Sequence, residues 1–208
     1  MKGFSRLLIL SDGHSGHLAG LTHPDFDFSR KPNPGTNRYK LWSVRRQLWR
    51  WYERTIKELQ PIDHLIYNGD AIDGKGKRSG STELVMPDRN EQCDNAAATI
   101  ELVGARNILM SFGSPYHTGY DEDWEVQIAN KVGALKIGGE DTANIDGLLI
   151  NYRHHISSSS VPYGGFTPLA KAQLWNLLWS QHDEYPKADI IIRSHVHTYL
   201  YAGSTDWR

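Results

Sequence analysis

The sequence predicts an α/β fold, and two patterns carry this prediction. Short apolar runs rich in Leu, Ile and Tyr recur along the chain and are typical of buried strands, because a buried helix needs ten residues or more. Longer amphipathic stretches, typical of helices, lie between these runs. The predicted strands cover residues 7–10, 64–67, 107–112, 148–153 and 189–193. A chain of 208 residues holds one ordinary domain, so a single domain is expected over 1–208.

The longest predicted helix spans 39–59 and ends before Pro61. Its apolar positions recur at spacings of three and four: Leu41, Val44, Leu48, Tyr52, Ile56 and Leu59. The opposite face is basic and is expected to be solvated; it includes Arg45, Arg46 and Arg50. If this face fronts the site, it can attract a polyanionic substrate through phosphate contacts.

Two further helices are expected. One begins with Thr167 as N-cap and Pro168 in the first turn, and runs to about His182. The other spans about 121–132. Four tryptophans at helical spacing are expected to pack in the core rather than stack on bases: Trp42, Trp49, Trp175 and Trp179. Segments 15–37 and 157–166 have little periodicity and are expected to form binding loops or lids.

Composition excludes several classes of protein. The 23 Lys and Arg residues nearly balance the 24 Asp and Glu residues, so a nucleic-acid coat or a polybasic membrane binder is not expected. Cys93 is the only cysteine, which excludes an internal disulfide and a Cys-rich zinc site. No apolar run approaches the roughly 20 residues that span a bilayer. A soluble, cytoplasmic protein with no membrane partner is expected.

Each predicted strand runs directly into polar residues that can bind a metal. These residues are Asp12 and His14, Asp70, Ser114 and His117, His154 and His155, and His195 and His197. Open α/β sheets bind ligands at the carboxyl edge of their strands, so a site is expected where these segments meet.

The motifs differ in strength when each is taken alone. Asp12-X-His14 and Asn68-Gly69-Asp70 are each more typical of a solvated turn. His195-X-His197 is sharper, because two imidazoles on one side of a strand both need partners in a core but make good ligands for zinc, manganese or iron. His154 and His155 point oppositely in a strand, so only one of them is expected to enter the site.

The ordered set of motifs, from Leu7 to His197, resembles the calcineurin-like metallophosphoesterase superfamily. That family's signature runs Asp-X-His, Gly-Asp, Gly-Asn-His, His and Gly-His-X-His. A narrower likeness to phage-encoded members rests on Gly16-His-Leu-Ala-Gly-Leu and on Arg153-His154-His155, and places the protein in the host cytoplasm. The resemblance implies a four-layer α/β/β/α sandwich of two mixed sheets.

The resemblance also implies a site for two divalent metal ions. Asp12, His14 and His197 would hold the first ion. Asp70 would bridge both ions, with His154 and His195 on the second. The third motif departs from the family, since Ser114 stands where Asn is usual and His117 follows later; Ser114 or a water would replace the Asn ligand. Ser194 replaces the usual Gly before His-X-His.

This ligand set suits phosphoester hydrolysis. Two cations neutralise the phosphoryl oxygens and lower the pKa of a bridging water, which supplies hydroxide near neutral pH. Asp70 and His117 are the candidate catalytic residues, His117 because an imidazole can protonate the leaving oxygen. Imidazole and carboxylate ligands without thiolate fit manganese, iron, zinc or nickel better than calcium.

Several alternatives remain open at this point. A phosphodiester substrate, including nucleic acid, is slightly favoured because of the basic helix; a phosphomonoester of a phosphoprotein or a nucleotide is the rival. Two other functions are also considered. One is a non-catalytic phosphate-binding scaffold with a degenerate metal site, and the other is a mononuclear metal hydrolase of another fold. The oligomeric state is left open. Only eleven residues follow His197, so the chain is minimal, a fragment, or completed by a partner subunit.

Residues outside the motif set are assigned simpler roles. His17 and His23 are expected at the surface, and His64 and His182 are expected to be structural. Three loop aromatics are the better candidates for stacking on a substrate: Tyr116, Tyr163 and Phe166.

Overall fold

The computed structural model describes residues 4–118, 124–159, 161 and 164–203. Seven strands form two sheets. The first sheet contains β1 (Leu7–Leu10), β2 (His64–Asn68), β3 (Asn107–Ser111) and β4 (Lys136–Gly138), all parallel and in this order. In the second sheet, β5 (Asp141–Ile145) runs antiparallel to β6 (Leu148–Arg153), and β6 runs parallel to β7 (Ile190–Arg193).

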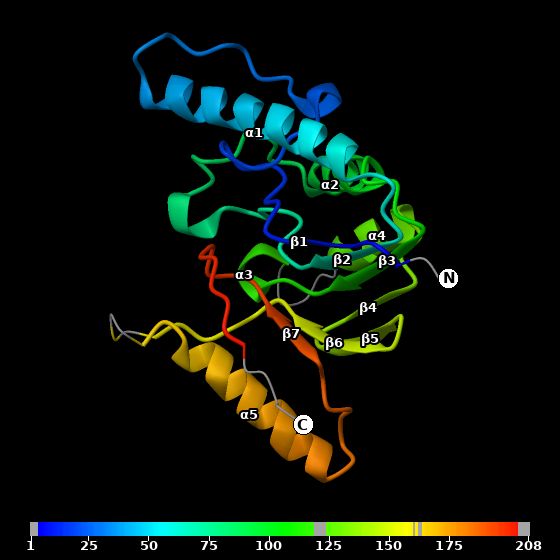
Figure 1. Cartoon of the computed structure of the whole chain (residues 1–208). Coiled ribbons are helices and arrows are strands. Elements are labelled where there is room, and N and C mark those ends of the chain that lie inside the picture. Colours follow the sequence, from blue (N-terminus) through cyan, green and yellow to red (C-terminus); the bar gives the residue numbers. More distant parts are fainter. Residues whose placement is uncertain (1–3, 119–123, 160, 162–163, 204–208) are drawn as a thin grey trace.

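The helices lie outside the pair of sheets (Figure 1). Helices α1 (Asn37–Leu59), α2 (Arg89–Glu101) and α4 (Trp124–Lys131) pack on the outer face of the first sheet, and α5 (Thr167–Gln181) lies beyond the second sheet. The short helices are α3 (Pro115–Thr118), η1 (Pro24–Phe26) and η2 (Lys77–Ser79). The fold is therefore mixed α/β, with the layers ordered helix, sheet, sheet, helix.

Alternation along the strands builds two apolar cores. Leu65, Tyr67 and Met110 face the helices, whereas Ile66 and Leu109 face the second sheet, where they meet Ile150. Successive strand residues point to opposite faces, so a parallel strand buried on both sides is apolar at nearly every position. This is why the short apolar runs predict strands correctly.

All five predicted strands are present, within one residue at their ends. The prediction of two mixed sheets is wrong for the first sheet, which is parallel throughout the described residues. Crossovers through α1 and α2 return the chain to the same edge, which makes successive strands parallel. Strands β4 and β5 and helix α2 were not predicted.

Helix α1 confirms the predicted helix, but two expectations about its faces are wrong. Arg45 is buried, and its guanidinium bonds to the Asp27 carboxylate at 2.8 Å and to the Leu18 carbonyl at 3.1 Å. Val44 and Leu59, predicted to lie on the buried apolar face, are exposed. The Arg45 side chain ties the loop before α1 to the helix, whereas Arg46 is exposed as expected.

Helix α5 starts at Thr167 as its first helical residue, with Phe166 rather than Thr167 as N-cap. None of its residues is buried, so the core positions predicted for Trp175 and Trp179 are wrong: these side chains are 47% and 46% exposed. Trp49 is buried as predicted. The start of the helix predicted over 121–132 lies outside the described residues, and α4 covers the rest.

Candidate metal centre

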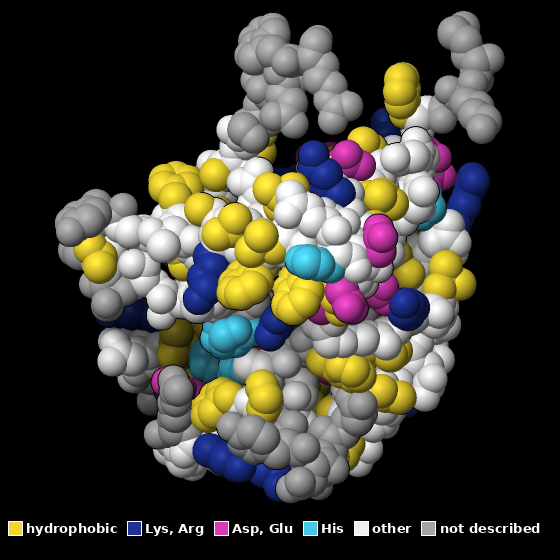
Figure 2. All heavy atoms as spheres, turned by 90° about the horizontal axis from the view of Figure 1, so that it is seen from below, with side chains coloured by type: hydrophobic (Ala, Val, Ile, Leu, Met, Phe, Trp, Pro, Cys, Tyr) yellow, Lys and Arg dark blue, Asp and Glu magenta, His cyan; other side chains and the backbone are white. Residues whose placement is uncertain are grey.

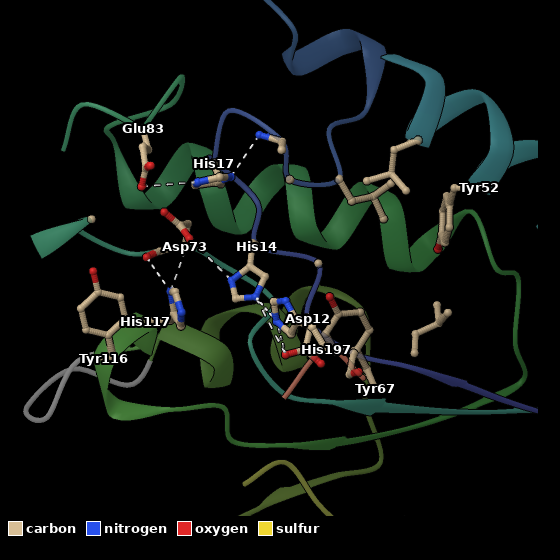
Figure 3. A pocket seen from close by; sticks show the side chains of 18 of the residues that line it. Asp12, His14, His17, Tyr52, Tyr67, Asp73, Glu83, Tyr116, His117 and His197 are labelled. Carbon is tan, nitrogen blue, oxygen red and sulfur yellow. Dashed lines mark hydrogen bonds and ion pairs between the residues drawn. The ribbon is translucent and has the colours of Figure 1, made fainter. Parts of the chain in front are cut away.

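The carboxyl ends of five strands meet at one place. Loops after β1, β2 and β3 of the first sheet face the loops after β6 and β7 of the second sheet. All the side chains predicted as ligands lie there: Asp12, His14, Asp70, Ser114, His154, His195 and His197. Figure 3 shows Asp12, His14, His117 and His197 pointing toward one another.

The first group of possible metal ligands contains Asp12, His14 and His197. The Nε2 atoms of the two histidines are 3.2 Å apart, and His197 Nε2 is 3.1 Å from Asp12 Oδ1. Two ring nitrogens and a carboxylate oxygen thus face one point, as expected for a cation with mixed nitrogen and oxygen ligands. This is the set predicted for the first metal ion.

The second group contains Asp70, His154 and His195. His154 Nε2 is 2.9 Å from Asp70 Oδ2 and 3.3 Å from His195 Nδ1. His154 Nδ1 donates to the Asn68 carbonyl at 2.7 Å, which fixes the ring with Nε2 toward the site. His154 is fully buried here, while the ring of His155 only contacts that of His195, at 5.1 Å between centroids. His154 is therefore the histidine of the pair that enters the site.

Asp70 belongs to the second group and also to a third group, with His14 and His117, and His14 is common to the third group and the first. Burial raises the pKa of the Asp70 carboxyl, but the hydrogen bond and charge of His154, with further contributions from His117 and the Ser114 amide, lower it to about 2. The carboxylate is therefore ionised at neutral pH. For His154, burial lowers the pKa of the ring, but its bond to Asp70 raises it overall.

Ser114 contacts the Asp70 carboxylate. Its amide donates to Asp70 Oδ1 at 2.6 Å, and its hydroxyl lies 3.2 and 3.3 Å from the two carboxylate oxygens. Gly113 before it has to be glycine, because a Cβ there would collide with the backbone and carboxylate of Asp70. The Gly-Ser turn therefore orients the shared carboxylate.

His117 stands beside the shared carboxylate, at the first turn after β3. Its Nδ1 donates to the Asp73 carbonyl at 2.9 Å, and its Nε2 is 4.0 Å from Asp70 Oδ2. Burial lowers the pKa of the His117 ring, so the ring is neutral at pH 7. A neutral imidazole with Nε2 directed at the site can exchange a proton there.

The backbone of the ligand loops is strained. Five residues of these loops have positive φ angles although none is glycine: Asp12 (56°), His14 (43°), Asp70 (52°), His195 (77°) and His197 (50°). Such conformations cost about 1–3 kcal/mol each and cluster at functional sites.

Sequence reasoning missed Glu125. This fully buried residue of α4 accepts a hydrogen bond from the Ala71 amide at 3.0 Å through Oε1, and one from the Gly113 amide through Oε2. These amides are next to Asp70 and Ser114, so Glu125 ties the two loops together. Burial raises the pKa of its carboxyl to about 7. A Glu in an amphipathic helix is usually solvated. The sequence around Glu125 therefore gives no sign that this residue links two loops.

Two cavities lie on this part of the molecule, and the first of them is lined by the candidate ligands Asp12, His14 and His197. The acidic cleft has a volume of about 740 Å³ and is lined by Asp12, Asp73, Glu83, His17 and Tyr116, among others, with no Lys or Arg (Figure 3). The second cavity, of about 540 Å³, lies against α5. Of the predicted stacking residues, Tyr116 lines the acidic cleft, Phe166 is exposed, and Tyr163 lies outside the described residues.

The remaining histidines belong to none of the three groups of possible metal ligands. His17 and His23 are half-buried rather than at the surface: His17 Nδ1 accepts from the Ala19 amide, and the His23 ring packs on Trp49. His64 contacts Asn107, and His182 is the C-cap of α5, both as expected.

Comparisons with known proteins assign no family. No family model matches the chain, and no curated protein matches it. Among solved structures, a protein of unknown function from Aquifex aeolicus aligns with a TM-score of 0.42 and 14% identity, over 94% of this chain and 81% of that one. A likeness at this level carries no argument. No helix among the described residues is long and apolar enough to cross a membrane.

Proposed function

We propose that this chain is a metal-dependent phosphoesterase of the calcineurin-like metallophosphoesterase type, with two divalent metal ions. The supporting observation is the position of Asp70, whose ionised carboxylate is shared by adjacent groups of metal ligands and has His117 at its side. A layered α/β fold with this centre at the strand ends agrees with that type.

The ligand groups fit a pair of divalent cations. Imidazole nitrogens that lie 3.2 Å apart in one pair and 3.3 Å apart in the other, with carboxylate oxygens next to them, form a donor set typical of manganese, iron, zinc or nickel. Asp12, His14 and His197 would hold one ion, and His154 and His195 the other, with Asp70 on both. When bound, such ions neutralise phosphoryl oxygens and lower the pKa of a water held between them.

The protein's own residues supply orientation and a proton path. Ser114 and Glu125 hold the shared carboxylate and its loop in place. The Asp73 carbonyl holds the His117 ring with Nδ1 protonated and the unprotonated Nε2 toward the site. Nε2 can therefore accept a proton from the attacking water, and the imidazolium so formed can return that proton to the leaving oxygen. We propose a phosphodiester as substrate, with a phosphomonoester as the alternative.

Hydrolysis of bis-p-nitrophenyl phosphate with added Mn²⁺ tests the proposal, with Asp70→Asn as the variant. We expect turnover by the wild type and a loss of about a hundredfold or more in the variant, because the shared ligand contributes several kcal/mol to the transition state. Asp25→Asn is the matched control, since Asp25 is 82% exposed and outside the centre.

Two further measurements separate the alternatives. Metal analysis of the purified protein is expected to give two ions per chain, and p-nitrophenyl phosphate reports monoesterase activity. No turnover of either ester with Mn²⁺, Fe²⁺, Zn²⁺ or Ni²⁺, together with one ion or none per chain, would contradict the proposal and favour a non-catalytic scaffold.

A further inference from the structure

The cavity beside α5 is lined by side chains that the proposed chemistry does not use. We call it the α5 groove; its charged and aromatic lining residues are Glu140, Arg153, His155, Lys171, Trp175, Trp179, Tyr185 and Arg193. Lys171, Trp175 and Trp179 follow one another at four-residue spacing and so share one face of α5. Figure 2 views this side of the molecule and shows hydrophobic side chains interleaved with Lys, Arg and His.

The groove carries an excess of positive charge. Its lining includes three cations and one carboxylate, and the Glu140 carboxylate already bonds to Arg153 at 3.3 Å and to Arg193 at 3.1 Å. Lys171 is exposed and makes no ion pair with any described residue. Because the whole chain has a net charge of −1, this local excess is a property of the groove.

Two aromatic rings are open to solvent in the same groove. Trp175 and Trp179 stack at 6.0 Å between centroids with an interplanar angle of 22°, and about half of each side chain is exposed. The exposed half of each ring is apolar surface that no described residue covers. Exposed aromatic rings beside cations are the elements with which proteins bind single-stranded nucleic acids, by stacking on bases and pairing with phosphates.

The groove also adjoins the metal centre. His155 lines it and contacts the ring of His195, a candidate ligand, at 5.1 Å between centroids. The acidic cleft on the other side has three carboxylates in its lining and no Lys or Arg. Of these carboxylates, Asp73 and Glu83 are not candidate ligands and disfavour a neighbouring phosphate in the cleft, whereas the cations of the groove favour one.

We infer that the α5 groove binds a nucleobase and its phosphate from a single-stranded nucleic acid whose adjacent phosphodiester lies at the metal centre. Trp175 and Trp179 stack on the base, and Lys171 and Arg153 contact phosphate. The inference deepens the proposed function and rests on it for the position of the cleaved bond; binding in the groove itself requires no catalysis.

Binding is measured by fluorescence anisotropy of a labelled ten-residue oligothymidylate in EDTA, so that hydrolysis plays no part. We expect Trp175→Ala to weaken binding about tenfold, as is typical for the loss of one stacking ring, and Trp175→Phe to restore most of it. Lys171→Ala is expected to lower the slope of log affinity against log salt concentration by about 0.7, the value for one phosphate contact to a single strand. Phe28→Ala and Lys40→Ala, both exposed and outside the groove, are the matched controls.

The following outcomes decide the inference. The inference is overturned, while the proposed function stands, if the wild type hydrolyses bis-p-nitrophenyl phosphate but does not bind the oligonucleotide. It is also overturned if neither groove variant weakens oligonucleotide binding. Binding that both variants weaken supports it even if no ester is hydrolysed. Competition by thymidine monophosphate that is as effective as competition by the unlabelled oligonucleotide overturns the assignment to a single strand, because the groove then binds a lone nucleotide. A dimer seen by sedimentation that Trp175→Ala dissociates overturns it, since the face then binds a second copy.

Discussion

Replacement of Glu125 by glutamine tests how the protein holds its two central loops. The carboxylate accepts one hydrogen bond from the Ala71 amide and one from the Gly113 amide, and it is fully buried. Glutamine has nearly the same shape but is never charged, and its single carbonyl oxygen can serve only one of these amides. The variant therefore removes a buried charge and leaves one buried N–H without an acceptor.

The pKa of Glu125 sets the size and sign of the effect on stability. Burial raises that pKa from 4.5 to about 7, and Asp70 adds to the increase, whereas the two amides and His154 oppose it. A raised pKa means that the folded state binds the proton more tightly than the unfolded state. This stabilisation is complete below pH 4.5 and is lost as the pH rises through 7. At about 1.4 kcal/mol per pH unit, the loss is on the order of 3 kcal/mol.

Urea unfolding of both proteins in EDTA, at intervals from pH 4 to pH 9, measures this difference. We expect the stability of wild type relative to Glu125→Gln to fall by about 3 kcal/mol between pH 4.5 and 7.5. Glu101→Gln, at an exposed position of α2, is the matched control and should parallel the wild type. A Glu125→Gln profile that also parallels the wild type would refute the assignment of a buried, titrating carboxyl. Metal affinity of the variant is expected to fall about tenfold or more, because the loop of Asp70 is less well held.

Three other predictions concern the buried ion pair of Arg45, the buried cysteine and the effect of metal on stability. Asp27→Ala leaves the Arg45 charge buried without its partner and should lower the free energy of unfolding in urea by about 3–5 kcal/mol. The exposed guanidinium of Arg46 lies 3.4 Å from the same carboxylate, and Arg46→Ala should lower the free energy of unfolding by about 1 kcal/mol or less. Equal losses in the two variants would contradict this prediction. Burial raises the pKa of the Cys93 thiol to about 12, so Ellman's reagent at pH 8 should label one thiol per chain only after unfolding. Metal at a hundred times its Kd should stabilise the fold by about 2.7 kcal/mol over the EDTA-treated protein, and an unchanged Tm would contradict a metal site.

The strands and the candidate ligands were predictable because their signals are local. A strand buried on both faces must be apolar for several residues in a row, and β2 and β3 show this in their sequences. A candidate ligand that follows such a strand directly lies at the carboxyl edge of the sheet, which is why Asp12, Asp70 and His154 could be named. The sequence left His154 and His155 as alternatives, and the bond from His154 to the Asn68 carbonyl distinguishes them.

Helix α2 was missed because it buries polar side chains. Gln92 bonds to the backbone of Gly74 and Met86, and Asn95 bonds to the Leu21 carbonyl and the His23 amide. Such a helix has no apolar stripe, so hydrophobic periodicity cannot detect it. Arg45 was assigned to the solvated face for a related reason, since its partner Asp27 lies 18 residues away in a loop.

The same buried polar bonds explain how the strained ligand loops persist. Asp12, His14 and Asp70 adopt positive φ angles that together cost several kcal/mol, so other interactions must hold them. Backbone bonds from the Asp12 amide to Gly69 at 3.0 Å and from the His14 amide to Asp70 at 3.1 Å continue the pairing of β1 with β2 beyond the sheet. Glu125 then joins the Asp70 loop to that of Gly113. The protein's own hydrogen bonds thus set the positions of candidate ligands that come from different strands, so the loops are linked without a metal ion.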